Sequence, residues 1–295
     1  MMKILLAVDT SAASRAVIEE AVARPWPLDS LFQVMSVIQP THLWTTLAAA
    51  QESARRAEEV VRSAVAQLEA KGLRAAGMTP AGDPKTVILD QAKASGADFI
   101  LAGPHGASAL RRLLVENVAA AVLRYAGCSV EVVRPRKRRV GREGMRVLLA
   151  ADGSEFSREA ARSLAGRPWP AHTEFRILSA VELMLPTARA FLEPPFLDTT
   201  YLEANRAEAM QRAQNAIATA AAVLQEAGWN ASESVSVLLE TPQVAILREA
   251  EEWGPDLIAV GSHGHRGFGR FLLGSTSEAV AMNADCSVDV IRKRG

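Results

Sequence analysis

Five glycines lie within residues 261–275, which read GSHGHRGFGRFLLGS. The apolar run at residues 256–260 before them is typical of a buried parallel strand. After them, Ser275 and Glu278 have the spacing of a helix capping box. Glycine lets the backbone approach a ligand closely, and a helix start offers unpaired N–H groups and a positive dipole end. A strand, a glycine-rich loop and a helix start in this order predict a phosphate-binding site.

Basic side chains add hydrogen-bond donors to this loop. Arg266 is a candidate to pair with phosphate, although it could equally be an ordinary surface arginine. His263 has a counterpart, His105, in the first half of the chain, which favours a structural role over a catalytic one. No cluster of acids is typical of a metal site, so Mg²⁺ would be carried by the phosphates together with water. The loop does not fit the P-loop motif.

The chain repeats itself. Residues 3–11 (KILLAVDTS) return as residues 146–154 (RVLLAADGS), an offset of 152 − 9 = 143, and the motif RPWP at residues 24–27 returns at 167–170. Residues 98–134 match 256–292 at an offset of 158. The second half therefore holds an insertion of 158 − 143 = 15 residues. We expect domains at 1–134 and 146–295, joined by a basic linker at 135–145.

Within each half, short apolar runs alternate with helical patterns. Strands are expected near residues 4–8, 31–37, 73–79, 99–102 and 129–133, with helices near 14–23, 52–71, 84–95 and 117–125. The second half repeats this pattern and includes a long alanine-rich helix near 201–227. Alternating β and α elements with fully apolar strands predict an α/β fold of two doubly wound parallel sheets. Ligands of such sheets lie beyond the carboxyl ends of the strands.

The spacing Gly261-x-x-Gly264, nine residues, then Gly274-Ser275 resembles the nucleotide loop of the universal stress protein family, in its ATP-binding branch. Asp152 at the end of the first strand of this half and the last strand at 287–291 are also similar to that family. The resemblance implies tandem five-stranded Rossmann-like, adenine nucleotide alpha hydrolase-like domains, each with strand order 3-2-1-4-5. It also implies a stress-response regulatory protein that binds ATP.

The resemblance further implies a role for each matching residue. Asp152, which Gly153 and Ser154 follow, would accept from ribose hydroxyls; the alternative is that it caps the turn. Ala180, expected just after the second strand of this half, would place backbone atoms against adenine. The first two loop glycines would meet the inner phosphates, and residues 274–276 would close over the outer ones. The predicted nucleotide-binding residues are Asp152, Gly153, Ser154, Ala180, Gly261, His263, Gly264, Arg266, Gly274, Ser275 and Thr276.

The first half departs from this pattern. Glu116 and Asn117 stand where the second half has Gly274 and Ser275, although Asp9 is kept. A carboxylate at roughly 4 Å from phosphate would cost about 4 kcal/mol at an effective dielectric constant of about 20. We therefore expect one ATP site per chain, in the second half.

Composition sets limits on the class of protein. The 295 residues contain 33 basic and 33 acidic side chains, with 49% hydrophobic residues, so small ligands or proteins are expected as partners rather than nucleic acid. The N-terminal apolar run is too short for a signal peptide and no stretch is long enough to span a membrane, which favours the cytoplasm. Cys128 and Cys286 occupy matching places, which indicates small core residues rather than a disulfide.

Two segments carry further hypotheses. The basic linker is interpreted as a solvated tether, with nucleic acid or acidic lipid as the less favoured partner. The inserted segment at 185–201 is apolar and is interpreted as a flap over the ligand, as a contact in a homodimer, or as an inert excursion. The last strand of each half is expected to pair with the other, which would make an intrachain pseudo-dimer. A slow ATPase and a ligand-free scaffold are the alternative functions.

Overall fold

The protein is described by a computed structural model, which covers residues 1–39, 47–104, 118–136, 144–182, 199–238, 241–264 and 273–293. The first half contains β1 (Lys3–Ala7), α1 (Ala12–Ala23), β2 (Leu31–Met35), α2 (Leu47–Glu69), β3 (Arg74–Met78), α3 (Pro84–Ser95), β4 (Phe99–Ala102), α4 (Val118–Tyr125) and β5 (Ser129–Val132). The second half contains β6 (Arg146–Ala150), α5 (Glu155–Ala165), β7 (Glu174–Glu182), α7 (Thr199–Glu226), β8 (Ala231–Leu238), α8 (Pro242–Trp253), β9 (Leu257–Gly261), α9 (Ser275–Asn283) and β10 (Ser287–Ile291).

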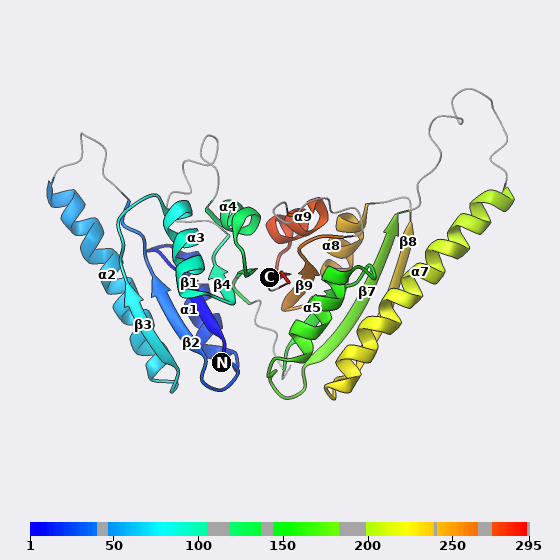
Figure 1. The fold of residues 1–295 in the computed structure, drawn as a ribbon, viewed down its shortest axis with the longest axis horizontal. Coiled ribbons are helices and arrows are strands. Elements are labelled where there is room, and N and C mark those ends of the chain that lie inside the picture. Colours follow the sequence, from blue (N-terminus) through cyan, green and yellow to red (C-terminus); the bar gives the residue numbers. More distant parts are fainter. Residues whose placement is uncertain are drawn as a thin grey trace, which may run out of the picture.

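The described strands form one ten-stranded sheet in the order β3-β2-β1-β4-β5-β10-β9-β6-β7-β8. Pairing within each half is parallel and follows the predicted order 3-2-1-4-5. Between the halves, β5 and β10 pair antiparallel, with Val132 opposite Val288. The predicted pseudo-dimer is therefore confirmed, and Figure 1 shows one half on each side of this seam.

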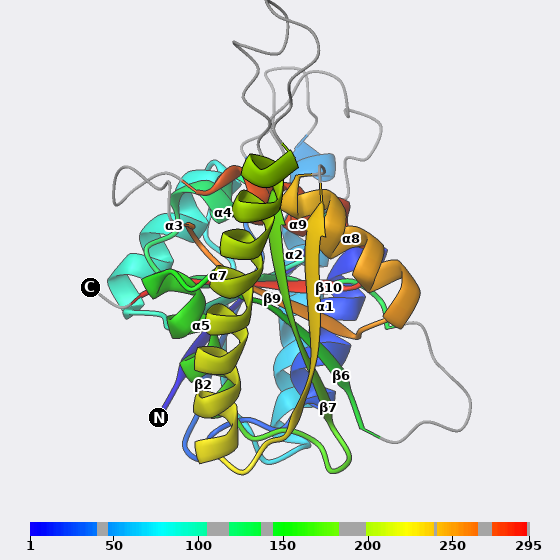
Figure 2. The same ribbon diagram turned by 90° about the vertical axis from the view of Figure 1, so that its right-hand side faces the viewer.

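Helices cover both faces of the sheet. Apolar residues of α1, α2, α5 and α7 pack on one face, and those of α3, α4, α8 and α9 pack on the other. Figure 2 shows α7 and α8 on opposite sides of β7 and β8. The strands were predicted to be apolar throughout because both faces are covered, and every residue of β9 and of β10 is buried. None of the described helices is long and apolar enough to cross a membrane.

The repeated RPWP motif ends the first helix of each half. Trp26 donates from its ring nitrogen to the Ala21 carbonyl at 2.8 Å, and Trp169 donates to the Leu164 carbonyl at the same distance. Each indole ring also meets a phenylalanine of the neighbouring strand, β2 or β7, edge to face. These bonds satisfy carbonyls that a helix end leaves without partners.

The arginines of the same motif neutralise two acids at the seam. Glu131 on β5 and Asp289 on β10 lie opposite each other, and neither is exposed to solvent. Arg24 donates to both carboxylate oxygens of Glu131, at 2.8 and 2.6 Å. Arg167 donates to Asp289 at 2.6 Å. Because an unpaired buried charge is strongly destabilising, the seam depends on both arginines.

The described ends of the linker contact the folded domain, although Pro135 and Arg136 at its start are exposed. Arg136 donates to Glu20 at 2.7 and 2.6 Å, and Glu20 also accepts from Arg24. Met145 at the far end is buried in the core. The start of the segment is therefore exposed but tied to α1, and its last residue is packed in the core. Residues 137–143 lie outside the described part of the chain.

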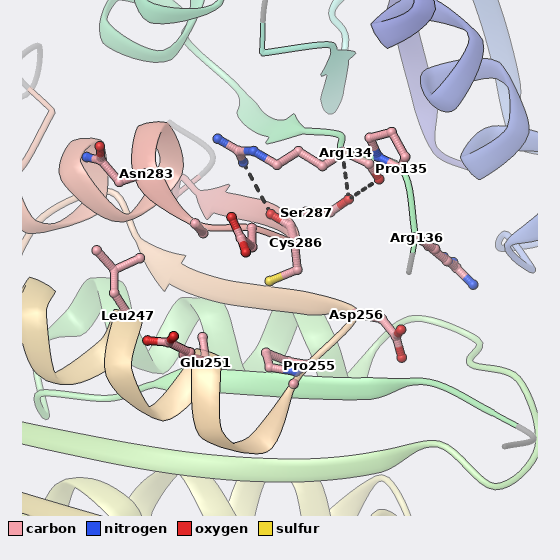
Figure 3. Close-up of a pocket in the computed structure, with 14 residues that line it drawn as sticks. Arg134, Pro135, Arg136, Leu247, Glu251, Pro255, Asp256, Asn283, Cys286 and Ser287 are labelled. Atoms are coloured by element: carbon pink, nitrogen blue, oxygen red, sulfur yellow. Dashed lines mark hydrogen bonds between the residues drawn. The ribbon is translucent and has the colours of Figure 1, made fainter. Parts of the chain in front are cut away.

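Arginines cross the seam in both directions to cap helices. Arg134, which follows β5, donates from its backbone to Ser287 at 3.1 Å and from its guanidinium to the Ala281 carbonyl of α9 at 2.7 Å. Figure 3 shows Arg134 beside Ser287, the first residue of β10. Arg292, which follows β10, donates in the same way to the Leu123 carbonyl of α4 at 2.5 Å. The last helix of each half is thus capped by the other half.

A cavity of about 310 Å³ lies beside Arg134, at the amino ends of β9 and β10. Glu251, Asp256 and Cys286 are among its lining residues (Figure 3). Cys128 and Cys286 are both free thiols, as predicted. Burial raises the pKa of Cys286 to about 12 and that of Cys128 to about 11, so both stay protonated at neutral pH.

The seam predicts a specific pH dependence of stability. Burial and the facing carboxylate of Asp289 outweigh the opposing charge of Arg24 and raise the pKa of Glu131 from 4.5 to about 8, so the ion pair of Glu131 with Arg24 is complete only above that pH. Between these values the folded chain holds a proton that the unfolded chain lacks, so this group's contribution to the free energy of unfolding falls as pH rises. Glu131→Gln cannot titrate and should flatten that fall, measured by urea unfolding between pH 5 and 8.5. Glu208→Gln, which changes an exposed side chain of α7, should keep the wild-type dependence of stability on pH. The same dependence in Glu131→Gln would contradict the raised pKa of Glu131.

Candidate functional site

Asp152 lies just beyond the carboxyl end of β6 and shapes the turn into α5. Its Oδ1 accepts the Ser154 N–H at 2.9 Å, and Gly153 between them has a φ of 83°. Ser154 caps α5 by accepting the Ser157 N–H at 3.2 Å. The turn-capping alternative is thus confirmed for one of the two carboxylate oxygens.

The other carboxylate oxygen of Asp152 faces the glycine-rich loop. A Cβ placed on Gly264 would lie 2.8 Å from Asp152 Oδ2. Gly264 itself is exposed, whereas Asp152 is half-buried. The structure therefore brings together the end of β6 and the loop after β9, which are more than 100 residues apart in the chain (264 − 152 = 112).

Gly261, at the end of β9, has a packing role. A Cβ there would lie 2.7 Å from the backbone carbonyl carbon of Phe156, in the first turn of α5. The first half has the same arrangement, since a Cβ on Gly103 would lie 2.7 Å from Ala13 Cβ. Phe156 replaces that alanine at the repeat offset of 143, so the larger side chain is particular to the second half (13 + 143 = 156).

His263 is part of the wall of the loop. Its side chain is 7% exposed, and its ring centroid lies 4.8 Å from that of Phe156. Nδ1 lies 3.1 Å from the Ser262 hydroxyl, while Nε2 is buried with no partner among the described residues. Burial, and secondly the positive charge of Arg292, lower the pKa of His263. A neutral, stacked ring fits the structural role rather than that of a cation for phosphate.

The start of α9 differs from the predicted capping box. Gly274 is the N-cap and Ser275 is the first helical residue, with no side-chain cap. The Gly274 N–H donates to the Ser262 carbonyl at 2.8 Å. The N-cap therefore lies one residue before the predicted one, Ser275. Glu278 does not fold back on the helix start because its carboxylate binds Arg124 of α4. The capping box is therefore wrong, and the reason is a partner in the other half.

This start leaves the first turn of α9 able to receive an anion. The first helical hydrogen bond runs from Glu278 N–H to the Gly274 carbonyl at 3.0 Å, so the N–H groups of Ser275, Thr276 and Ser277 have no helical acceptor. The Ser277 hydroxyl, which sequence reasoning missed, donates to the Gly261 carbonyl at 2.6 Å. That bond holds the helix start at the end of β9. The serines at 275 and 277 were the only signal in the sequence.

Ala180 lies within β7 and not after it, because β8 pairs with β7 as far as Glu182. It lies opposite Ser236, two residues beyond Leu178, which pairs with Ala150 of β6. Ala180 therefore reaches the same carboxyl edge as Asp152, as its predicted role requires. The predicted position relative to the strand end was wrong.

Several predicted features fall outside the described residues. They are His265, Arg266 and Arg270 of the loop, the inserted segment at 185–198, and the first-half loop that contains His105, Glu116 and Asn117. Among the residues that are described, no group of three or more His, Cys, Asp or Glu side chains is placed to hold a metal ion.

The acid retained in the first half is held differently from its counterpart. Asp9 Oδ1 accepts both the Ser11 N–H at 2.9 Å and the Ser14 hydroxyl at 2.7 Å. In the second half the serine at the equivalent position, Ser157, instead donates to the Ser154 carbonyl at 3.1 Å. The equivalent serine hydroxyls therefore bind different acceptors in the two halves, a carboxylate in the first and a backbone carbonyl in the second.

Comparison with known proteins agrees with the fold. A model of the universal stress protein family matches residues 1–134 and 145–292. A universal stress protein from Mycolicibacterium smegmatis is 30% identical over 312 aligned residues, which cover 99% of this chain and 97% of that protein. A universal stress protein structure from Archaeoglobus fulgidus has a TM-score of 0.67 at 25% identity, covering 99% of this chain and 96% of that one. A putative one from Pseudomonas aeruginosa has a TM-score of 0.59 at 18% identity, covering 100% and 94%, and shows the fold alone.

The contact between Gly261 and Phe156 predicts that Gly261→Ala is destabilising. The new Cβ would meet backbone atoms that cannot move independently of α5, so the free energy of unfolding should fall by about 1–3 kcal/mol. Urea unfolding would measure this. Gly127→Ala is the matched control, since a Cβ there meets nothing within 4 Å. Equal stability of the two variants would show that the helix and strand are not in tight contact.

Proposed function

The chain belongs to the universal stress protein family, and we propose that its second half binds an adenine nucleotide, ATP, while its first half binds no triphosphate. One observation carries the proposal: the Asp152 carboxylate and the backbone of Gly264 approach each other beside the start of α9. It supports the proposal because a carboxylate that can accept from a nucleoside then lies near helix N–H groups that lack helical acceptors, at the carboxyl edge where doubly wound sheets bind ligands.

Asp152 is the residue proposed to bind the ribose. The Ser154 N–H orients the carboxylate by holding Oδ1, and Oδ2 faces the exposed Gly264. A carboxylate in this position can accept hydrogen bonds from ribose hydroxyls. A glycine at 264 is needed because any side chain would begin 2.8 Å from the same oxygen. Ala180 at the neighbouring strand supports a base beside the ribose.

The first turn of α9 is proposed to bind phosphate. The N–H groups of Ser275 and Thr276 lack helical acceptors, and the helix dipole favours an anion at this end. Ser275 is exposed, so a ligand can reach it from solvent. Mg²⁺ would enter with the phosphates and keep most of its water ligands. The bound phosphate chain would run from Gly264 toward this turn.

The first half is proposed to have lost this capacity. Glu116 replaces the glycine that begins α9, and its charge would repel phosphate. In that half the Ser14 hydroxyl binds the Asp9 carboxylate, whereas the equivalent Ser157 hydroxyl binds a backbone carbonyl. A nucleoside without phosphates remains compatible with that half.

The proposed role is regulation through binding rather than turnover. Hydrolysis requires a group that orients water or accepts a proton. Of the candidate bases, His263 is buried against Phe156 with a lowered pKa and lies in the wall of the loop. We propose that ATP binding changes which partners the chain binds. The proposed location is the cytoplasm, and the chain is proposed to act as a monomer or a homodimer.

Calorimetry with ATP should give about one site per chain. Asp152→Asn keeps an oxygen for the Ser154 N–H but loses the charge and one acceptor, so it should weaken ATP about 10-fold, equivalent to about 1.4 kcal/mol. Asp9→Asn is the matched change in the first half and should leave the affinity unchanged. Two sites of similar affinity, or equal effects of the two variants, would overturn the assignment to the second half.

Gly274→Glu copies the first-half residue and should abolish ATP binding, because its charge would stand at the first turn of α9. Gly274→Ala adds only a Cβ, which would lie 3.2 Å from the Ser262 carbonyl oxygen, and separates crowding from charge. Thermal unfolding would confirm that both variants fold. Nucleotide released from the freshly purified protein, identified by mass spectrometry, tests the ligand itself. The absence of any bound nucleotide would favour a ligand-free scaffold. Steady release of phosphate from added ATP would favour an ATPase.

A further inference from the structure

We propose that Arg124, in the first half, is a positioning residue for the nucleotide site of the second half. It neutralises Glu278 in the first turn of α9 and holds that turn against α4. The inference rests on the proposed function, because it concerns the affinity of the same site for phosphate.

The contact crosses the seam between the two halves. Arg124, in the last turn of α4, donates from Nε at 2.9 Å and from Nη2 at 2.6 Å to Oε1 of Glu278. The two side chains are 43% and 26% exposed. Figure 1 shows α4 and α9 beside each other above the middle of the sheet. The first turn of α9 therefore carries an ion pair whose cation comes from the other domain.

The charge of Glu278 matters because of where α9 begins. An acid in the first turn of a helix is itself favourable, since it faces the positive end of the dipole. A phosphate bound at the same turn would compete for that dipole and would be repelled by the carboxylate. With Arg124 in place, the pair contributes no net charge. The helix start is then left for the ligand.

A second contact ties the same end of α4 to the loop. Arg292, directly after β10, donates to the carbonyls of Leu123 at 2.5 Å and Arg124 at 3.3 Å. The preceding residue, Ile291, pairs with Gly261 and accepts the Ser262 N–H at 2.8 Å, which places Arg292 near the glycine-rich loop. The end of α4 is thus joined to residues on two sides of the proposed site.

The ion pair has no counterpart in the other direction. At the repeat offset of 158, Glu278 corresponds to Ala120 (278 − 158 = 120) and Arg124 corresponds to Met282 (124 + 158 = 282). The reciprocal caps of Arg134 and Arg292, in contrast, are present in both directions. The charge compensation is therefore one-sided and serves the half that is proposed to bind the nucleotide.

The partial exposure of the Arg124–Glu278 ion pair allows its effect on ligand affinity to be distinguished from an effect on the free energy of unfolding. A partly exposed ion pair adds little to stability, so the pair is expected to act mainly on the ligand. Arg124→Ala should weaken ATP about three- to tenfold, the effect of one uncompensated charge at roughly 10 Å with partial screening. Adenosine, which has no phosphate, should bind as it does to wild type.

The charge argument predicts opposite signs for the two partners. Glu278→Gln removes the carboxylate from the first turn of α9 while the positive charge of Arg124 remains, so it should tighten ATP binding by a similar factor. The double variant Arg124→Ala with Glu278→Gln restores the wild-type net charge and should return ATP affinity close to wild type. Arg212→Ala on α7 removes a 2.7 Å ion pair away from the seam and serves as the matched control. Calorimetry of ATP and adenosine on the full chain, with thermal unfolding alongside, measures all of these.

The outcomes are distinguishable. If wild type binds neither ATP nor adenosine, the proposed function fails and this inference fails with it. If wild type binds ATP and Arg124→Ala binds it equally well, only the inference is overturned. Equal losses for ATP and adenosine that Glu278→Gln does not rescue would mean general damage to the seam, which also overturns it. If Arg124→Ala does not fold, Glu278→Gln provides the test, and an unchanged ATP affinity in that variant would overturn the inference.

Discussion

The antiparallel pairing of β5 with β10 is the constraint on which the rest of the structure depends. Its register places Glu131 opposite Asp289 in the middle of a ten-stranded sheet, where neither carboxylate meets solvent. Two such charges are tolerated only if each is paired, since an uncompensated buried charge costs several kcal/mol. Arg24 and Arg167 supply the pairing. The seam thus explains the arginine of the repeated RPWP motif, which pairs with an acid on the last strand. The tryptophan of the motif binds a carbonyl at the end of the first helix.

The same seam makes the two halves depend on each other at their ligand edges. It brings α4 against α9, and it lets Arg134 and Arg292 each cap the last helix of the opposite half. The two halves are therefore joined by direct side-chain contacts next to the last helix of each half.

The glycines of the loop serve packing and ligand approach together. Gly261 is required by the close passage of Phe156, and Gly264 by the carboxylate of Asp152. Only the second of these leaves an exposed backbone beside a candidate acceptor. Glycine content alone therefore does not tell which of these two positions a ligand could approach, whereas what a Cβ would meet separates them.

The sequence by itself determined the repeat and the α/β class, because these follow from local periodicity and from motifs at constant offsets. The strand order came from the resemblance of the loop to the universal stress protein family, and the pairing of the last strands from the need to cover the edge of each sheet. Only the tertiary structure decided that Gly274 caps α9, that Glu278 binds Arg124, that Asp152 faces Gly264, and that the linker ends are held. Each of these involves partners that the sheet brings together. Helix and strand type is set by neighbours within a few residues, whereas the partner of a charged or polar side chain is set by the register of strands more than 100 residues apart, as for Arg24 and Glu131 (131 − 24 = 107).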